Sequence, residues 1–178
     1  MFSRTDSTEF WLPLPVVLVD DEQKLREEFM ELVGLEYPER ELHVFESLDD
    51  ARRNLFTVTN TRPFGLVLDH NLGGEEKGWH LGTEVRDHHP WGLAIPIVYW
   101  SGFMGHEEFS EQVANLGSLA PTCLMRKQNY NIIDAVNKID EDFSIAAPAF
   151  LQHVQSLRVH EFDLDKWDSL LTESETSA

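Results

Sequence analysis

The sequence predicts an α/β domain built on a doubly wound sheet of five parallel strands. Five short apolar runs recur along the chain, and segments with the apolar spacing of helices lie between them. Most of these runs lack the alternation of apolar and polar residues that a half-exposed strand shows. Strands buried on both faces, as in a parallel sheet covered by helices, have this composition.

The five apolar runs are rich in β-branched and aromatic residues, which favour strands. Pro96 lies early in the fourth run, where a missing backbone donor is tolerated. Right-handed crossovers in a unit of roughly one hundred residues favour the flavodoxin-like strand order 2-1-3-4-5. The predicted strands span residues 16–19, 42–45, 66–68, 95–100 and 122–125.

The segments between the runs have apolar residues at helical spacing, and residues that commonly begin or end helices flank them. Ser47 begins a sequence that resembles a capping box, and Pro90 and Gly117 follow two of the stripes, where helices commonly end. We therefore expect one helix after each strand. The stripes are Leu25, Phe29, Leu32 and Val33; Ala51 and Leu55; Leu81 and Val85; Phe109, Val113 and Leu116; and Ile132, Ile133, Val136 and Ile139.

The chain divides into three predicted parts. Residues 1–14 form an N-terminal arm, residues 15–143 form the α/β domain, and residues 144–178 form a C-terminal helical extension with a disordered end. Two apolar stripes in the extension must be buried, either against the domain or in a contact with another protein. They comprise Phe150, Leu151, Val154 and Leu157, then Leu164, Trp167, Leu170 and Leu171.

Composition excludes several classes of protein. The chain has 14 Lys and Arg against 32 Asp and Glu, a net charge of −18, which argues against sequence-independent binding to nucleic acid or to anionic membranes. The single cysteine, Cys123, excludes a disulfide framework. No apolar run is long enough to span a membrane, and the N-terminus lacks the features of a secretory signal. We therefore expect a cytoplasmic protein.

Polar residues follow four of the predicted strands at their carboxyl ends, where open parallel sheets carry their sites. Asp20 and Asp21 follow the first strand, Asp69 the third, Ser101 the fourth and Lys127 the fifth. Each residue alone has an ordinary explanation as a helix cap, a turn former or a solvated side chain. Their joint occurrence at the ends of successive strands points to a site.

This set of side chains has a specific chemistry. Clustered carboxylates repel one another, and a divalent cation with a preference for oxygen ligands, best Mg²⁺, relieves that repulsion. Asp69 is a competent phosphoryl acceptor on the central strand. A lysine and a hydroxyl group can stabilise charge on the transferring oxygens, which gives Lys127 and Ser101 a use.

Four segments with these residues resemble the receiver domain of two-component response regulators, over about residues 14–143. They are residues 17–22, 66–72, 96–102 and 124–127. The resemblance implies that Asp69 accepts a phosphoryl group from a phosphohistidine, that Ser101 and Lys127 contact it, and that Gly102 leaves room for it. It further implies that Asp20, Asp21, Asp69 and the backbone carbonyl of Asn71 bind Mg²⁺.

The sequence departs from the family pattern in three places. Gly73 and Gly74 stand where a proline is usual, and Gly78 comes one residue late, so we expect a longer and looser loop after Asp69. Gln128 replaces the proline that usually follows the lysine. Leu124 replaces the aromatic residue that serves as a rotamer switch, so activation by that route is not expected.

The resemblance implies a stand-alone response-regulator receiver in a phosphorelay, a phosphoprotein that catalyses only its own phosphorylation and dephosphorylation. Its partners would be a sensor histidine kinase or histidine phosphotransfer protein and a downstream protein target, with a homodimer as a further option. One alternative is a receiver-like binding module that does not depend on phosphorylation. Another is a Mg²⁺-dependent aspartyl-phosphate phosphohydrolase; such enzymes place the acceptor after the first strand, which disfavours this alternative.

Overall fold

The computed structural model describes residues 13–59, 62–73, 77–102, 110 and 120–158. Their elements, in chain order, are β1 (Val16–Val19), α1 (Gln23–Glu36), β2 (Leu42–Phe45), α2 (Leu48–Thr59), β3 (Gly65–Leu68), α3 (Gly78–His88), β4 (Ile97–Ser101), β5 (Thr122–Arg126) and α5 (Ile132–Arg158).

The strands form one parallel sheet in the order β2-β1-β3-β4-β5, which confirms the predicted fold. The register aligns the strand ends: Val19 pairs with both Phe45 and Leu68, and Leu68 pairs with Tyr99. Asp20 and Asp69, which follow β1 and β3, are therefore level with Trp100 of β4 at one edge of the sheet, and Ser101 ends β4 one residue further along.

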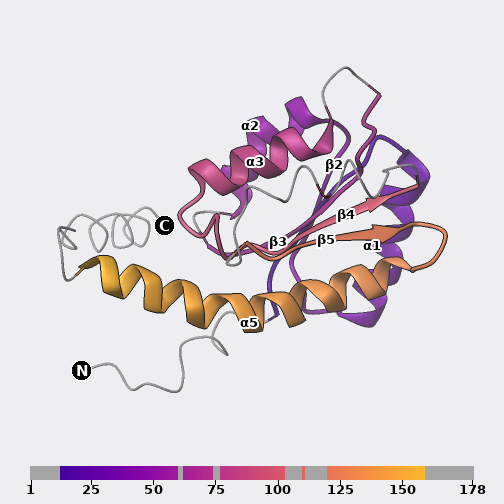
Figure 1. Ribbon diagram of the computed structural model, residues 1–178. Helices are drawn as coiled ribbons and strands as arrows, with labels where there is room; N and C mark the ends of the chain where they lie inside the picture. Colours follow the sequence, from indigo (N-terminus) through magenta and orange to yellow (C-terminus); the bar gives the residue numbers. More distant parts are fainter. Residues whose placement is uncertain (1–12, 60–61, 74–76, 103–109, 111–119, 159–178) are drawn as a thin grey trace, which may run out of the picture.

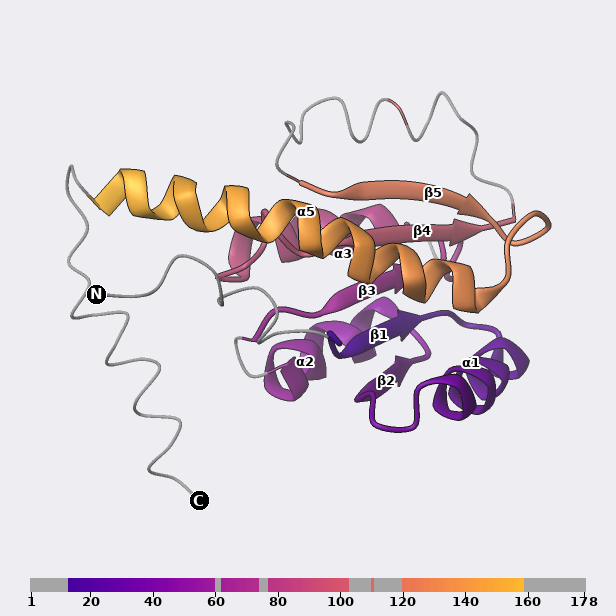
Figure 2. The ribbon, with the colours of Figure 1, turned by 90° about the horizontal axis from the view of Figure 1, so that it is seen from below.

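Helices cover both faces of the sheet (Figures 1 and 2). Helices α1 and α5 lie on one face, where Phe29 and Phe143 pack with Val16 and Leu18 of β1. Helices α2 and α3 lie on the other face and bury the alternate β1 residues. Strands β1, β3 and β4 are buried on both faces, which explains their unbroken apolar sequences.

Local signals behave largely as the sequence predicts. The Ser47 hydroxyl accepts a hydrogen bond from the backbone N–H of Asp50 at 3.1 Å and so caps α2. In α1, Phe29 and Val33 are buried, but Leu32 is 40% exposed. The α1 stripe is thus narrower than predicted, because Leu32 lies at the margin of the contact with the sheet.

Helix α5 differs from the prediction in length. It runs without a break from Ile132 to Arg158, so the expected division between residues 143 and 144 lies inside one helix. The C-terminal part of α5 projects past the end of the sheet (Figure 1). Trp91 packs against the middle of α5, with ring centroids 6.2 Å from Phe143 and 5.3 Å from Phe150. Continuous packing of the stripe explains why the helix does not end at the domain boundary.

Several predictions concern residues outside the described ranges. These are the arm up to residue 12, the helix predicted through Phe109, Val113 and Leu116, and the chain beyond residue 158. Leu14, which we assigned to the arm, is fully buried in the core and belongs to the domain. Within the described residues, the structure has no helix both long enough and apolar enough to cross a bilayer.

Candidate functional site

The residues of the predicted site lie together at the carboxyl ends of the strands. Hydrogen bonds of the sheet continue one residue past β1 and β3: Asp20 N donates to Phe45 O at 3.1 Å, and Asp69 N donates to Val19 O at 2.9 Å. The sheet therefore fixes the backbone of both aspartates.

Three carboxylates converge at this edge. Asp20, Asp21 and Asp69 each present an oxygen within 4.8 Å of the other two, and this is the one such group of acidic, His or Cys ligands in the described part of the chain. Asp20 is fully buried, Asp69 is 9% exposed and Asp21 is exposed. The cluster is thus open to solvent on the side of Asp21 and closed beneath it.

The buried carboxylate of Asp20 is held by protein donors. Its Oδ1 accepts a hydrogen bond from the backbone N–H of Glu22 at 2.9 Å, and its Oδ2 accepts one from Lys127 Nζ at 2.7 Å. Arg26 Nη1 donates to the backbone carbonyl of Asp20 at 2.8 Å. We did not predict Arg26 from the sequence, although its position in the first turn of the helix after Asp20 indicates that it can reach that residue.

Lys127 connects the strands electrostatically. Its Nζ lies 2.7 Å from Asp20 Oδ2 and 3.3 Å from Asp69 Oδ2, so one ammonium neutralises part of the charge of two buried carboxylates. The same nitrogen lies 5.3 Å from the centre of the Trp100 ring, within cation–π range.

Burial sets the electrostatics of the predicted acceptor. Desolvation raises the pKa of Asp69, and the nearby Asp20 carboxylate raises it further, while Lys127 and a backbone hydrogen bond at His70 lower it. The net pKa shift is upward. Burial thus disfavours the ionised form of Asp69, and a further cation beside it would favour that form.

Ser101 ends β4 and is 1% exposed, with its register partner Arg126 on β5. The backbone N–H of Lys127 donates to Ser101 O at 3.4 Å. The structure thus places Ser101 and Lys127 side by side at the ends of adjacent strands.

Both described ends of the loop after Asp69 are fixed by backbone contacts. Asn71 and Lys77 form an antiparallel bridge, and Gly78 N donates to His70 O at 3.0 Å. A Cβ on Gly78 would lie 2.1 Å from the carbonyl oxygen of Asp69, so only glycine permits this approach. Residues 74–76 of the loop lie outside the described ranges.

The other two departures from the family pattern lie beside the site. The Gln128 amide donates to the carbonyl of Gly102 at 3.0 Å and so ties the loop after β5 to the end of β4. Leu124 pairs with Tyr99, which is 3% exposed in the core. Gln128 therefore supplies a contact between the two loops where a proline is usual.

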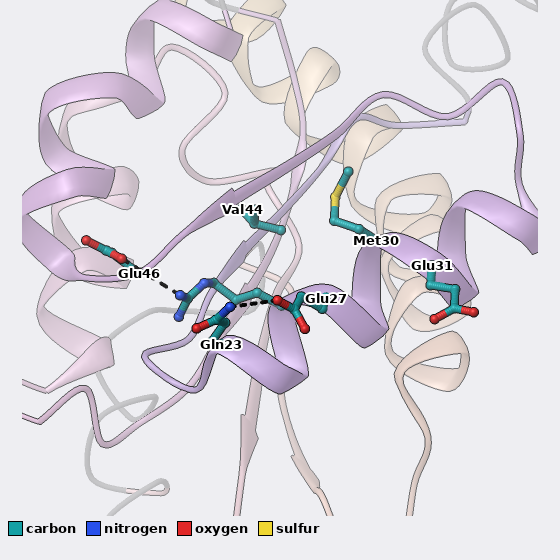
Figure 3. Close-up of a pocket in the computed structure, with 7 residues that line it drawn as sticks. Gln23, Glu27, Met30, Glu31, Val44 and Glu46 are labelled. Atoms are coloured by element: carbon teal, nitrogen blue, oxygen red, sulfur yellow. Dashed lines mark hydrogen bonds and ion pairs between the residues drawn. The ribbon is translucent and has the colours of Figure 1, made fainter.

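A groove of about 880 Å³ lies between α1 and β2 (Figure 3). Arg26 lines this groove, and its Nη2 lies 3.8 Å from Oε2 of Glu46. Because Arg26 also donates to Asp20 O, it forms the boundary between the groove and the site. The remaining lining residues are Gln23, Glu27, Met30, Glu31 and Val44.

The fold recurs in solved receiver domains. The signal receiver domain of a DNA-binding response regulator from Colwellia psychrerythraea 34H is 20% identical, with a TM-score of 0.57 over 72% of this chain and 96% of that one. A CheY-like receiver domain protein from Methanospirillum hungatei JF-1 is 18% identical, with a TM-score of 0.57 over 75% and 96%. This chain has the receiver-domain fold.

The receiver fold extends to a structure from another kind of protein. The signal receiver domain of a signal transduction histidine kinase from Syntrophus aciditrophicus is 15% identical, with a TM-score of 0.54 over 74% of this chain and 90% of that one. No protein-family model matches this sequence, and no curated protein matches it significantly. The similarity to known proteins is therefore a similarity of fold.

Proposed function

We propose that this receiver fold accepts a phosphoryl group on Asp69 from a phosphohistidine donor and signals through changed protein contacts. The observation that carries the proposal is the position of Lys127, whose ammonium lies between Asp20 and Asp69 at the ends of three strands. Such a cation beside a nearly buried carboxylate suits an incoming dianionic group. In an ordinary turn or cap, neither carboxylate would need this long-range partner.

The charges support a Mg²⁺ requirement. Three carboxylates and one ammonium sum to −3 + 1 = −2, the charge that a divalent cation neutralises. All three cluster ligands are oxygens, which Mg²⁺ prefers. Asp20, Asp21 and Asp69 would hold the ion, with the carbonyl of Asn71 as a fourth ligand, and the ion would offset the charge of the phosphoryl group.

The residues of the chain have separate roles in the transfer. An oxygen of Asp69 attacks phosphorus, the bond from phosphorus to the donor nitrogen breaks, and the histidine keeps the electron pair. Lys127 pairs with the phosphoryl oxygens, and the Ser101 hydroxyl donates to them. Hydrolysis later restores Asp69. The chain thus catalyses only its own phosphorylation and dephosphorylation.

The partners follow from this chemistry. The phosphoryl donor is a sensor histidine kinase or a histidine phosphotransfer protein, and the known receiver domain within a histidine kinase supports that class. The output is a contact with a protein target or a second copy of the chain. The outer face of α5 is well placed for it, since Ile145 on that helix is 68% exposed. Light scattering before and after phosphorylation tests the dimer.

Phosphorylation by acetyl phosphate with Mg²⁺, followed by intact mass measurement, tests the assignment. The wild-type chain should gain one phosphoryl group, and Asp69→Asn should gain none while it keeps the same circular dichroism spectrum. Asp134→Asn is a matched control on the surface, where Asp134 only caps α5. A normal mass increment on Asp69→Asn would exclude Asp69 as the acceptor. Absence of any wild-type adduct favours the phosphorylation-independent binding module.

A further inference from the structure

Lys77 occupies a fixed position at the start of α3, next to the loop that follows Asp69. Its backbone N–H donates to His80 Nδ1 at 2.9 Å, and its carbonyl accepts from His80 N at 3.0 Å. Trp79 stacks on the His80 ring at 3.7 Å between centroids. The Lys77 backbone is therefore anchored by the first turn of the helix.

The side chain of Lys77 reaches back across the loop. Its Nζ donates to Asn71 Oδ1 at 2.9 Å, in addition to the backbone bridge between the two residues. Gly78 presses the same segment onto the backbone of Asp69. The ammonium and the Asn71 amide therefore lie in one anchored unit, two residues from the predicted acceptor.

We infer that Lys77 is a positioning residue that orients the side-chain amide of Asn71 toward the phosphoryl group on Asp69. The inference rests on the proposed function. Lysine has three donors and no acceptor, so only the oxygen of the Asn71 amide can face it. Because a carboxamide carries its oxygen and its NH₂ group on opposite sides, this contact also sets the direction of the NH₂ donor.

The oriented donor affects hydrolysis of the acyl-phosphate. Water attacks phosphorus, the bond from phosphorus to the Asp69 oxygen breaks with its electron pair left on Asp69, and the proton of the water passes to the released phosphate. A donor aimed at the phosphoryl oxygens stabilises the charge of that transition state. Without Lys77, the Asn71 side chain rotates about its broad χ2 torsion, its NH₂ group no longer points at the phosphoryl oxygens, and hydrolysis slows.

The experiment compares lifetimes of the phosphorylated chain. The full-length protein is phosphorylated with acetyl phosphate and Mg²⁺, desalted, and followed by intact mass. Lys77→Met should lengthen the half-life about tenfold, less than the loss of a direct oxyanion donor would, because Lys77 acts through the amide. Lys77→Arg, which keeps donors for the Asn71 oxygen, should restore a half-life close to wild type. Lys24→Met, at an exposed lysine on α1, controls for net charge and should change nothing.

A double-mutant comparison separates positioning from charge. Asn71→Ala should lengthen the half-life as Lys77→Met does, and the double variant should live no longer than Asn71→Ala alone. A full Lys77→Met effect in the Asn71→Ala background would overturn the inference, as would the same effect in Lys24→Met.

Two readouts distinguish this inference from the proposed function. A wild-type adduct whose lifetime Lys77→Met leaves unchanged overturns only the inference, whereas a wild-type chain that accepts no phosphoryl group overturns both. The side-chain NH₂ resonances of Asn71 report on the contact without any phosphoryl group. They should shift in Lys77→Met and stay in place in Lys24→Met; resonances that do not shift contradict the contact.

Discussion

The buried ring of His89 should make the stability of this fold depend on pH in a defined range. His89 is the C-cap residue that follows α3, and it is 5% exposed. Its ring stacks on Phe56 at 5.8 Å and meets the edge of Phe64 at 5.2 Å, and its Nδ1 accepts from the backbone N–H of Trp91. Its Nε2 has no partner among the described residues. Burial therefore lowers the pKa of His89 from 6.5 to about 4.

The sign of the effect follows from proton linkage. The unfolded chain binds a proton at His89 below pH 6.5, while the folded chain stays neutral until about pH 4. The stabilisation is present above the unfolded pKa and is lost as the pH falls through this window. At 1.36 kcal/mol for each unit of pKa shift, the loss is about 2 kcal/mol by pH 5 and about 3 kcal/mol by pH 4.

The assay is urea unfolding at about pH 7 and pH 5, compared between wild type and His89→Asn. Asparagine keeps an acceptor for the Trp91 N–H and does not titrate, so its packing defect is the same at both values of pH. The wild type should lose about 2 kcal/mol more between the two conditions than His89→Asn does. His88→Asn, at the exposed neighbour, should behave as wild type. Equal losses in wild type and His89→Asn would refute the reasoning.

Three further perturbations have defined outcomes. Gly78→Ala should cost about 3 kcal/mol in urea unfolding because its Cβ meets Asp69 O at 2.1 Å, whereas Gly34→Ala, with nothing within 4 Å, should be neutral or slightly stabilising. Arg86→Met should cost about 2–4 kcal/mol, since the buried guanidinium donates to the carbonyls of Gly92, Ile95 and Pro121; a smaller loss would mean that water replaces it. Asp21→Ala should lose the thermal stabilisation by Mg²⁺ that wild type and Asp134→Ala retain, and an equal shift in all three would exclude Asp21 from the metal site.

The sequence predicts the sheet and the rim of the site well because both depend on local composition. The apolar runs place the strands to within one or two residues, and parallel register then brings Asp20, Asp69 and Lys127 to one edge. Helix ends depend on tertiary contacts instead. Helix α5 continues past the predicted boundary because Trp91 packs on Phe143 and Phe150, a contact that no local pattern in α5 contains.

The contacts that the sequence does not predict depend on where side chains lie in the folded structure. Lys77 lies six residues from Asn71, and the extra loop residue before Gly78 gives only the weak indication that the loop differs. His70, next to the predicted acceptor, is 3% exposed because the start of α3 closes over it, and no local pattern in the sequence indicates this burial. Both depend on Gly78, whose missing side chain lets the helix approach the strand end.

The site therefore has two parts with different mechanical origins. The sheet fixes Asp20, Asp69, Ser101 and Lys127 through ladder hydrogen bonds, and changing these positions requires disturbing the core. The two described ends of the loop, at Asn71 and at Lys77 and Gly78, are held by one backbone approach and one ammonium–amide contact, which a substitution can remove without touching the sheet. Phosphoryl acceptance should depend on the first part and phosphoryl lifetime on the second. Under the proposed function, a change in the loop alone would therefore alter the duration of the signal, while the chemistry of acceptance would stay the same.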